Sequence, residues 1–223
     1  GSDGQLNILY WQAPSLLNPY LSGGTKERDA SSIVLDPLAS SNEDGTLVPA
    51  LAREIPTVEN GGVAADFTSI TWKLKEGLIW SDGTPITTTD VKFTADYCMH
   101  PEGGCAQFSR FDGVEKVEIV DEHTITIYFA SPKPYPYVPF IGASSPIIQA
   151  AQFEDCLGAR APQCTDENFN PIGSGPFVVV DFRPNDTIKL EANDNFRDPD
   201  KPAFAPVPFK GGAVAVGAEG TVV

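Results

Sequence analysis

The chain has 223 residues, of which 41% are hydrophobic and 20% are charged, and it carries a formal net charge of −15. This composition indicates a globular protein with a full hydrophobic core. The sequence contains no run of about 18 apolar residues, so it predicts no membrane span. The negative field would repel a nucleic-acid duplex or an anionic membrane, so we expect no nucleic-acid partner.

The N-terminal part of the chain begins with a short apolar strand. This strand is predicted over Gln5 to Trp11, and a loop with two prolines ends it. A helix is predicted over Arg28 to Leu35, where apolar residues recur at helical spacing. Asp29 is expected to be its cap or first-turn acid, and Pro37 is expected to end it. Leu47 to Arg53 is expected to be a short connection with an apolar face.

The central part is predicted to contain a strand, a helix and a hairpin. Ser69 to Lys75 alternates apolar and polar residues, which is typical of a half-buried strand. After a turn, Thr88 or Thr89 is expected to cap a helix that ends in the first cysteine loop. Val114 to Val120 and Thr124 to Phe129 alternate cleanly and predict a hairpin. The expected core side chains here include Ile70, Trp72, Leu74, Trp80, Val91, Phe93, Ala95 and Tyr97.

Prolines determine the character of the segment that follows. Ser131 to Pro139 contains four prolines, so it cannot be a central strand. Its Tyr135 and Tyr137, together with Phe140, are expected to pack between subdomains or, alternatively, to add aromatic surface. Ile147 to Phe153 is expected to be a short helix.

The C-terminal part is predicted to contain a second hairpin and a weakly patterned tail. The strands of this hairpin are Phe177 to Phe182 and Thr187 to Leu190. Lys201 to Val223 has little charge and no clear period, and its stretch from Gly211 to Ala218 is typical of a linker or a poorly specified strand.

The four cysteines form two close pairs, Cys98 with Cys105 and Cys156 with Cys164. Two local disulfides are the simplest interpretation, and they indicate an oxidising compartment. The alternative is a zinc site, but the cysteine spacings are too long for one. The two histidines, His100 and His123, are expected in a surface loop and at a hairpin turn, so we predict no metal site.

Four stretches together resemble the family 5 extracellular solute-binding proteins, the peptide- and nickel-binding components of ABC importers. The third stretch, with its Asp-Gly turn and Asp-Val helix start, is the most specific. In chain order the stretches are Pro14 to Pro19; Leu47 to Ala52; Ile70 to Thr87 with the following Asp90-Val91-Lys92-Phe93; and Pro171 to Phe177.

The resemblance implies a mixed α/β fold, namely lobe I plus the extra subdomain of a type II periplasmic binding protein. Residues 1–32 would form the first part of lobe I, residues 33–150 the inserted subdomain and residues 151–210 the return to lobe I. Residues 211–223 would be a linker-like tail or a replacement strand. Family members have about twice this length and close two lobes around a ligand, so the second lobe is expected to be absent, either in a fragment or in an engineered chain.

The resemblance also places the ligand between the lobes. The loop after the first strand would line the cleft with Tyr10, Trp11, Gln12, Ala13 and Ser15. The turn of Gly142, Ser144 and Ser145 would offer further polar groups. An aromatic wall beside amide and hydroxyl groups suits a peptide or another small polar organic ligand. The alternative is that Tyr10 and Trp11 are ordinary core residues at the end of a strand.

The function implied by the resemblance is ligand capture for an ABC permease. Such a protein is bacterial, lies in the periplasm or on the cell surface, and is tethered there as a lipoprotein. We expect it to need no cofactor and to be no enzyme, because the sequence has neither a phosphate loop nor a nucleophile elbow. Two alternatives remain: a secreted hydrolase that uses His100 or His123, and an isolated lobe that acts only as a structural scaffold.

Overall fold

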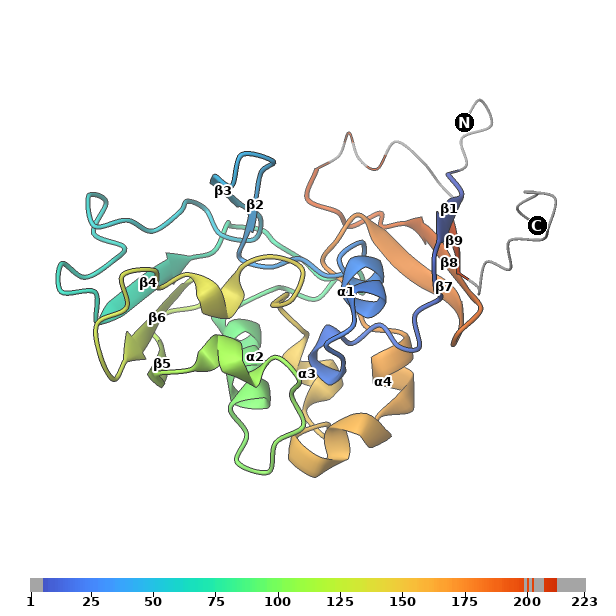
Figure 1. The fold of residues 1–223 in the computed structure, drawn as a ribbon. Coiled ribbons are helices and arrows are strands. Elements are labelled where there is room, and N and C mark those ends of the chain that lie inside the picture. Colours follow the sequence, from blue (N-terminus) through green and yellow to red (C-terminus); the bar gives the residue numbers. More distant parts are fainter. Residues whose placement is uncertain (1–5, 199, 201, 203–206, 212–223) are drawn as a thin grey trace.

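The computed structural model describes residues 6–198, 200, 202 and 207–211. The structure has a three-stranded and a four-stranded sheet. Figure 1 shows them at opposite ends of the molecule, with the helices between and below them. The helices are α1 (Thr25–Ser31), α2 (Thr88–Cys98), α3 (Ala150–Phe153) and α4 (Thr165–Phe169). Short 3₁₀ helices cover Pro19–Leu21 (η1), Phe108–Phe111 (η2), Val138–Phe140 (η3) and Gly158–Gln163 (η4).

The four-stranded sheet brings the two ends of the chain together. Its strand order is β1 (Ile8–Tyr10), β9 (Val207–Gly211), β8 (Thr187–Ala192) and β7 (Phe177–Arg183). β1 runs parallel to β9, and the other neighbours are antiparallel. The predicted second hairpin is therefore confirmed. Part of the predicted tail forms β9, and residues 212–223 lie outside the described residues.

The three-stranded sheet is formed by the central part of the chain. Its order is β4 (Ser69–Lys73), β6 (Thr124–Phe129) and β5 (Val114–Ile119), and all neighbours are antiparallel. The predicted strand and first hairpin are confirmed, and Ile70, Trp72 and Leu74 are buried. A separate two-stranded ribbon pairs β2 (Ala39–Ser41) with β3 (Leu47–Pro49), so the predicted connection at Leu47 begins with a strand.

The first helix differs from its prediction. It begins at Thr25 and ends at Ser31, so the expected range of Arg28 to Leu35 and the role of Asp29 as a cap or first-turn acid are wrong. Its first-turn acid is Glu27. The helix has its C-cap at Ser32, and beyond it the carbonyl oxygen of Val34 accepts a hydrogen bond from the backbone of Gly175 (2.8 Å).

The segment Gly173-Ser174-Gly175 needs its two glycines because of this same contact. A Cβ atom on Gly173 would lie 2.3 Å from the carbonyl oxygen of Val34, and one on Gly175 would lie 2.8 Å from it. Ser174 Oγ accepts a hydrogen bond from the backbone of Asp36 (3.0 Å). The Gly-Ser-Gly stretch therefore packs backbone to backbone against the segment after α1.

The second helix has its cap one residue before the predicted positions. Thr87 is the N-cap, and its hydroxyl accepts a hydrogen bond from Thr89 N while its own backbone donates to Asp90. Thr88 is the first helical residue, and its hydroxyl donates to the carbonyl oxygen of Asp121 (2.6 Å). The predicted core residues of this helix are buried except for Phe93, which is only partly buried.

The predicted helix at 147–153 is shorter than expected. Only α3 is helical, because the backbone N–H groups of Ile147 and Ile148 donate to Asp36 O and Thr94 Oγ1 instead. The proline-rich segment forms no strand, as predicted. Its aromatic residues divide between the two expected roles: Phe140 is fully buried, whereas 54% of Tyr135 is exposed.

Both predicted disulfides are present, and their loops pack on each other. A Cβ atom on Gly104, in the first loop, would lie 2.4 Å from the carbonyl oxygen of Gly158, in the second. One on Gly158 would lie 2.5 Å from Nδ1 of His100. The contact joins the end of α2 to the segment before α4.

We therefore expect Gly104→Ala to lower the free energy of unfolding by about 3 kcal/mol, because strain at φ +98° adds to the clash with Gly158. The matched control is Gly103→Ala, whose backbone has φ +76° but whose Cβ would meet no atom within 4 Å. It should cost only about 1 kcal/mol. Urea unfolding of both oxidised variants tests this, and equal losses would contradict the packing of the two loops.

Candidate ligand-binding site

The first-strand loop, residues 10–15, follows β1 at the edge of the four-stranded sheet. Trp11 is 59% exposed and Gln12 is exposed too, so Trp11 is not a core residue. Tyr10 is partly buried against the core, and its hydroxyl donates to the carboxylate of Asp29 on α1. The rings of Tyr10 and Trp11 lie 6.0 Å apart. The loop thus presents an aromatic pair next to an amide side chain.

The second half of this loop is anchored to its surroundings. Ala13 is buried, and the carbonyl oxygen of Pro14 accepts a hydrogen bond from Asn185, in the turn between β7 and β8 (2.9 Å). The backbone N and the Oγ of Ser15 both donate to Glu27 Oε1, at 3.1 and 2.8 Å. These bonds fix the path of the loop.

Glu27 is the buried carboxylate at the centre of this anchor, with 2% of the residue exposed. It also accepts hydrogen bonds from Lys26 and from Ser22. Burial by itself would raise the pKa of Glu27, but the bonds from Lys26 and Ser15 outweigh it and bring the pKa below its usual value. Glu27 is therefore held in its charged form at neutral pH.

The second predicted group of site residues forms a tight turn. Gly142 has φ +71°, a conformation that favours glycine, and its carbonyl oxygen accepts a hydrogen bond from Ser145 N (3.0 Å). Ser145 is fully buried, and its hydroxyl donates to the carbonyl oxygen of Pro139. Gly142 and Ser144 are partly exposed. Among the described residues, no hydrogen bond joins this turn to the first-strand loop.

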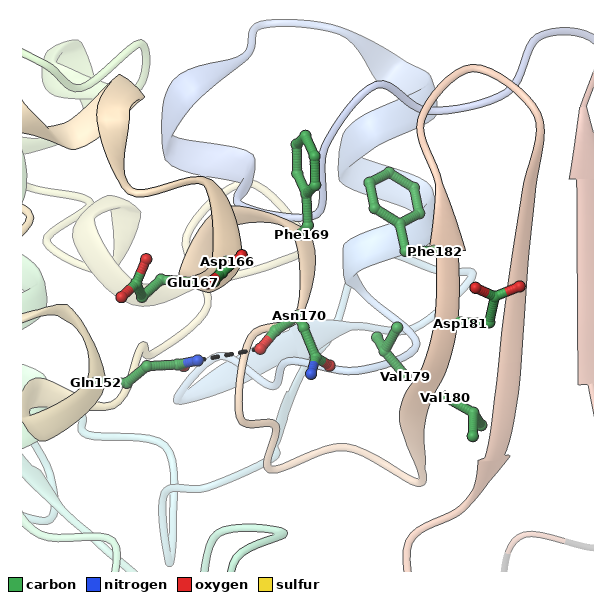
Figure 2. A pocket seen from close by; sticks show the side chains of 9 residues that line it. All are labelled: Gln152, Asp166, Glu167, Phe169, Asn170, Val179, Val180, Asp181 and Phe182. Carbon is green, nitrogen blue, oxygen red and sulfur yellow. Dashed lines mark hydrogen bonds between the residues drawn. The ribbon is translucent and has the colours of Figure 1, made fainter.

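A hollow of about 500 Å³ lies between α3, α4 and β7. Figure 2 shows Phe169 and Phe182 side by side at one end of it, and their ring centroids are 5.2 Å apart. Gln152 crosses the hollow and donates to the carbonyl oxygen of Asn170 (3.0 Å). Its remaining lining residues are Asp166, Glu167, Val179, Val180 and Asp181.

The hollow leaves no signature in the sequence, because its residues come from three separate elements and share no local motif. Its connection to the first-strand loop runs through the next residues of the chain. Leu17 N donates to the carbonyl oxygen of Asn168 (2.8 Å), and the side chain of Asn18 donates to that of Asn168 (2.8 Å). The hollow is acidic and aromatic, which suits an amine or another cation.

Two groups relevant to metal binding and catalysis are placed by the structure. Cys156, Cys164 and Glu167 lie close together, but the two sulfur atoms form a disulfide and offer no thiolate.

His100 follows the C-terminal end of α2, whereas the turn that carries His123 binds the N-terminal end of α2. The two histidines therefore lie near opposite ends of this 11-residue helix, about 16 Å apart along its axis.

None of the helices formed by the described residues has the length and apolar character of a membrane span.

The sequence model of bacterial extracellular solute-binding proteins, family 5, matches residues 46–214. Protein XP55 of Streptomyces lividans is 30% identical over 191 residues, which is 85% of this chain and 32% of XP55. A putative ABC transporter peptide-binding protein of Brucella ovis is 27% identical over 139 residues, which is 60% of this chain and 25% of that protein. This chain thus spans about a third or less of the length of these relatives.

Solved structures show the same fold. The ABC transporter substrate-binding protein CtaP of Listeria monocytogenes superposes with a TM-score of 0.79 and 28% identity, over 94% of this chain and 41% of CtaP. The oligopeptide-binding protein AppA of Bacillus subtilis, solved with a nonapeptide, has a TM-score of 0.80 and 23% identity, over 93% of this chain and 40% of AppA. The expected mixed α/β fold of a periplasmic binding protein is confirmed over that part.

The lowered pKa of Glu27 predicts that the stability of the folded protein depends on pH. Because the pKa of Glu27 is lowered in the folded protein, its contribution to stability is present above its usual value of 4.5 and is lost as the pH falls through the lower folded value. Glu27→Gln should therefore destabilise the protein by about 1–2 kcal/mol at neutral pH. The difference from the wild type should shrink below the usual Glu27 pKa.

Urea unfolding at a series of pH values measures this difference. Glu43→Gln, at an exposed residue of the β2–β3 turn, is the matched control and should leave stability unchanged at neutral pH. A Glu27→Gln difference that stays constant into the acid range would contradict the anchoring role of the Glu27 charge.

Proposed function

Because the chain belongs to the bacterial extracellular solute-binding proteins of family 5, we propose that it serves as the substrate-binding component of an ABC importer. Its proposed ligand is a peptide or a similar small polar organic molecule. The ligand would be captured outside the membrane, in the periplasm or at the surface of a bacterial cell, and delivered to the permease. Closure of two lobes about a hinge is the proposed mechanism of capture.

The exposure of Trp11 is the observation that supports this proposal most directly. The protein has three tryptophans, and Trp72 and Trp80 are completely buried. A large aromatic side chain that is 59% exposed beside an anchored strand end is a common feature of binding surfaces. It stands where the family resemblance predicts the ligand.

The eight predicted site residues are proposed to contribute in two ways. Tyr10, Trp11 and Gln12 would contact the ligand with their side chains, as would Ser144 beside the backbone of Gly142. Three others already use their side chains within the fold, so they would act through their backbone or by placing their neighbours: Ala13, Ser15 and Ser145.

Binding without catalysis is the function we propose over the hydrolase and scaffold alternatives. Its relatives are described as binding proteins, which supports this choice. A hydrolase would need a nucleophile with a positioned base, and Nδ1 of His100 already accepts a hydrogen bond from the backbone of Glu102 (3.3 Å). A purely structural scaffold would not require an exposed tryptophan such as Trp11 on an anchored loop.

A titration with mixed tripeptides to pentapeptides tests the proposal. Trp11 is the exposed tryptophan, so its fluorescence should change saturably on binding. We expect a dissociation constant of about 0.1–1 mM for this chain, because it spans only 40% or so of the solved relatives and would supply part of the contacts. Calorimetry on Trp11→Ala should show affinity reduced by about tenfold.

Phe108→Ala is the matched control, since Phe108 is also highly exposed (64%) but lies on η2, away from the first-strand loop. It should leave the affinity unchanged. If a cooperatively folded chain gives no saturable signal, that result counts against peptide binding by this loop. If Trp11→Ala and Phe108→Ala lose affinity equally, the binding is nonspecific.

A further inference from the structure

A second cavity lies in the predicted inserted subdomain, between η2 and η3. It has a volume of about 290 Å³ and is separate from the first-strand loop and from the hollow of Figure 2. Arg110 and Lys133 line it, together with the exposed ring of Tyr135. Its apolar walls are Phe129, Pro136, Val138 and Pro139, and Ser109 and Asp112 complete it.

The charge of this cavity is opposite to that of the protein. The chain has a net charge of −15, yet two of the cavity's lining residues are cations. Within the described part of the chain, neither Arg110 nor Lys133 takes part in an ion pair, and the lining carboxylate of Asp112 is within 4.0 Å of neither charge. Neither cation therefore has a counter-ion among the residues that the structure describes.

The guanidinium of Arg110 is held in place but only partly satisfied. Its Nη2 donates to the carbonyl oxygen of Ile141 (2.8 Å), which fixes its orientation. Its Nε is buried without an acceptor among the described residues, and Nη1 has none either. Burial lowers the pKa of Arg110, as expected for a cation with reduced hydration. An uncompensated, partly buried cation is costly, and an anion nearby would offset that cost.

Lys133 is placed by its backbone rather than by its charge. Its N–H donates to the carbonyl oxygen of Phe67 (2.8 Å), and its side chain passes over Gly113, where a Cβ atom would lie 2.8 Å from the Lys133 Cε. Lys133 therefore lines the cavity from a fixed backbone segment. Tyr135 is positioned there by an edge contact with Tyr137, at 5.1 Å between ring centroids.

We propose that this cavity is a second binding site, for a small organic monocarboxylate with an apolar body. The carboxylate would accept hydrogen bonds from Arg110 Nη1 and from Lys133, and the apolar body would lie against Tyr135 and the proline walls. The volume is close to the lower limit for ligand pockets, which fits a small molecule. The site is independent of the function proposed above.

Benzoate is the probe, and its binding is followed by the backbone amide NMR shifts of the whole chain. We expect saturable shifts at the residues that line the cavity, with a dissociation constant of about 1–10 mM. Benzyl alcohol, which lacks the charge, should cause no saturable shift. Inorganic phosphate, which lacks the apolar body, should bind at least about fivefold more weakly than benzoate.

Lys133→Gln should weaken benzoate about fivefold, and it leaves the backbone bond to Phe67 intact. Arg110→Lys should also weaken it, because a lysine lacks the planar guanidinium. Lys116→Gln, at an exposed lysine of β5 that pairs with Glu118, is the matched control and should have no effect. If Arg110→Lys fails to fold, Lys133→Gln decides the question.

The proposal is overturned by any of three results: no saturable shift up to about 20 mM benzoate, equal weakening in Lys116→Gln, or unchanged affinity in Lys133→Gln. Phosphate binding as tight as benzoate binding would overturn the organic part of the assignment.

Discussion

The buried carboxylate of Asp90 is the interaction on which the arrangement of this structure depends. It accepts hydrogen bonds from Thr87 N (2.9 Å), from Ala150 N (2.9 Å) and from Trp80 Nε1 (3.4 Å). One side chain thus starts α2, positions α3 and orients a fully buried tryptophan. Burial raises the pKa of Asp90 above its usual value, although these three hydrogen bonds each act to lower it. Because each donor comes from a different segment, no neighbouring residue can replace it.

The predicted ligand loop is built on the same physical principle. Glu27, another buried acid, receives both polar groups of Ser15, while Asn185 holds Pro14 from the opposite side. Two anchors so close to Trp11 reduce the conformational entropy that a ligand would have to remove on binding. An exposed aromatic residue on a fixed loop is therefore better suited to recognition than the same residue on a mobile one. The proposed role in solute capture follows from this combination of exposure and rigidity.

The two halves of the described structure are also joined by contacts that only small residues allow. The disulfide loops meet at Gly104 and Gly158, and the Gly173–Gly175 stretch lies against Val34. Disulfides constrain the unfolded chain in an oxidising environment, which agrees with an extracellular family. These contacts hold the end of α2 against the segment before α4, and the segment after α1 against the residues that precede β7.

Elements with a strong local pattern could be read from the sequence alone: the strand at Ile70 to Leu74, both hairpins, both disulfides and the family resemblance. Pattern suffices there because each partner is close in sequence or each face is plainly apolar. Three features were decided only by the tertiary structure. Thr87 caps α2 while the neighbouring Thr88 bonds a distant carbonyl, and the hollow of Figure 2 gathers residues from three elements. β9 lies between β1 and β8 although it contains Pro208, and its printed pairs with β1 begin one residue after that proline, at Phe209. Non-local backbone pairing of this kind leaves no periodic signal in a single sequence.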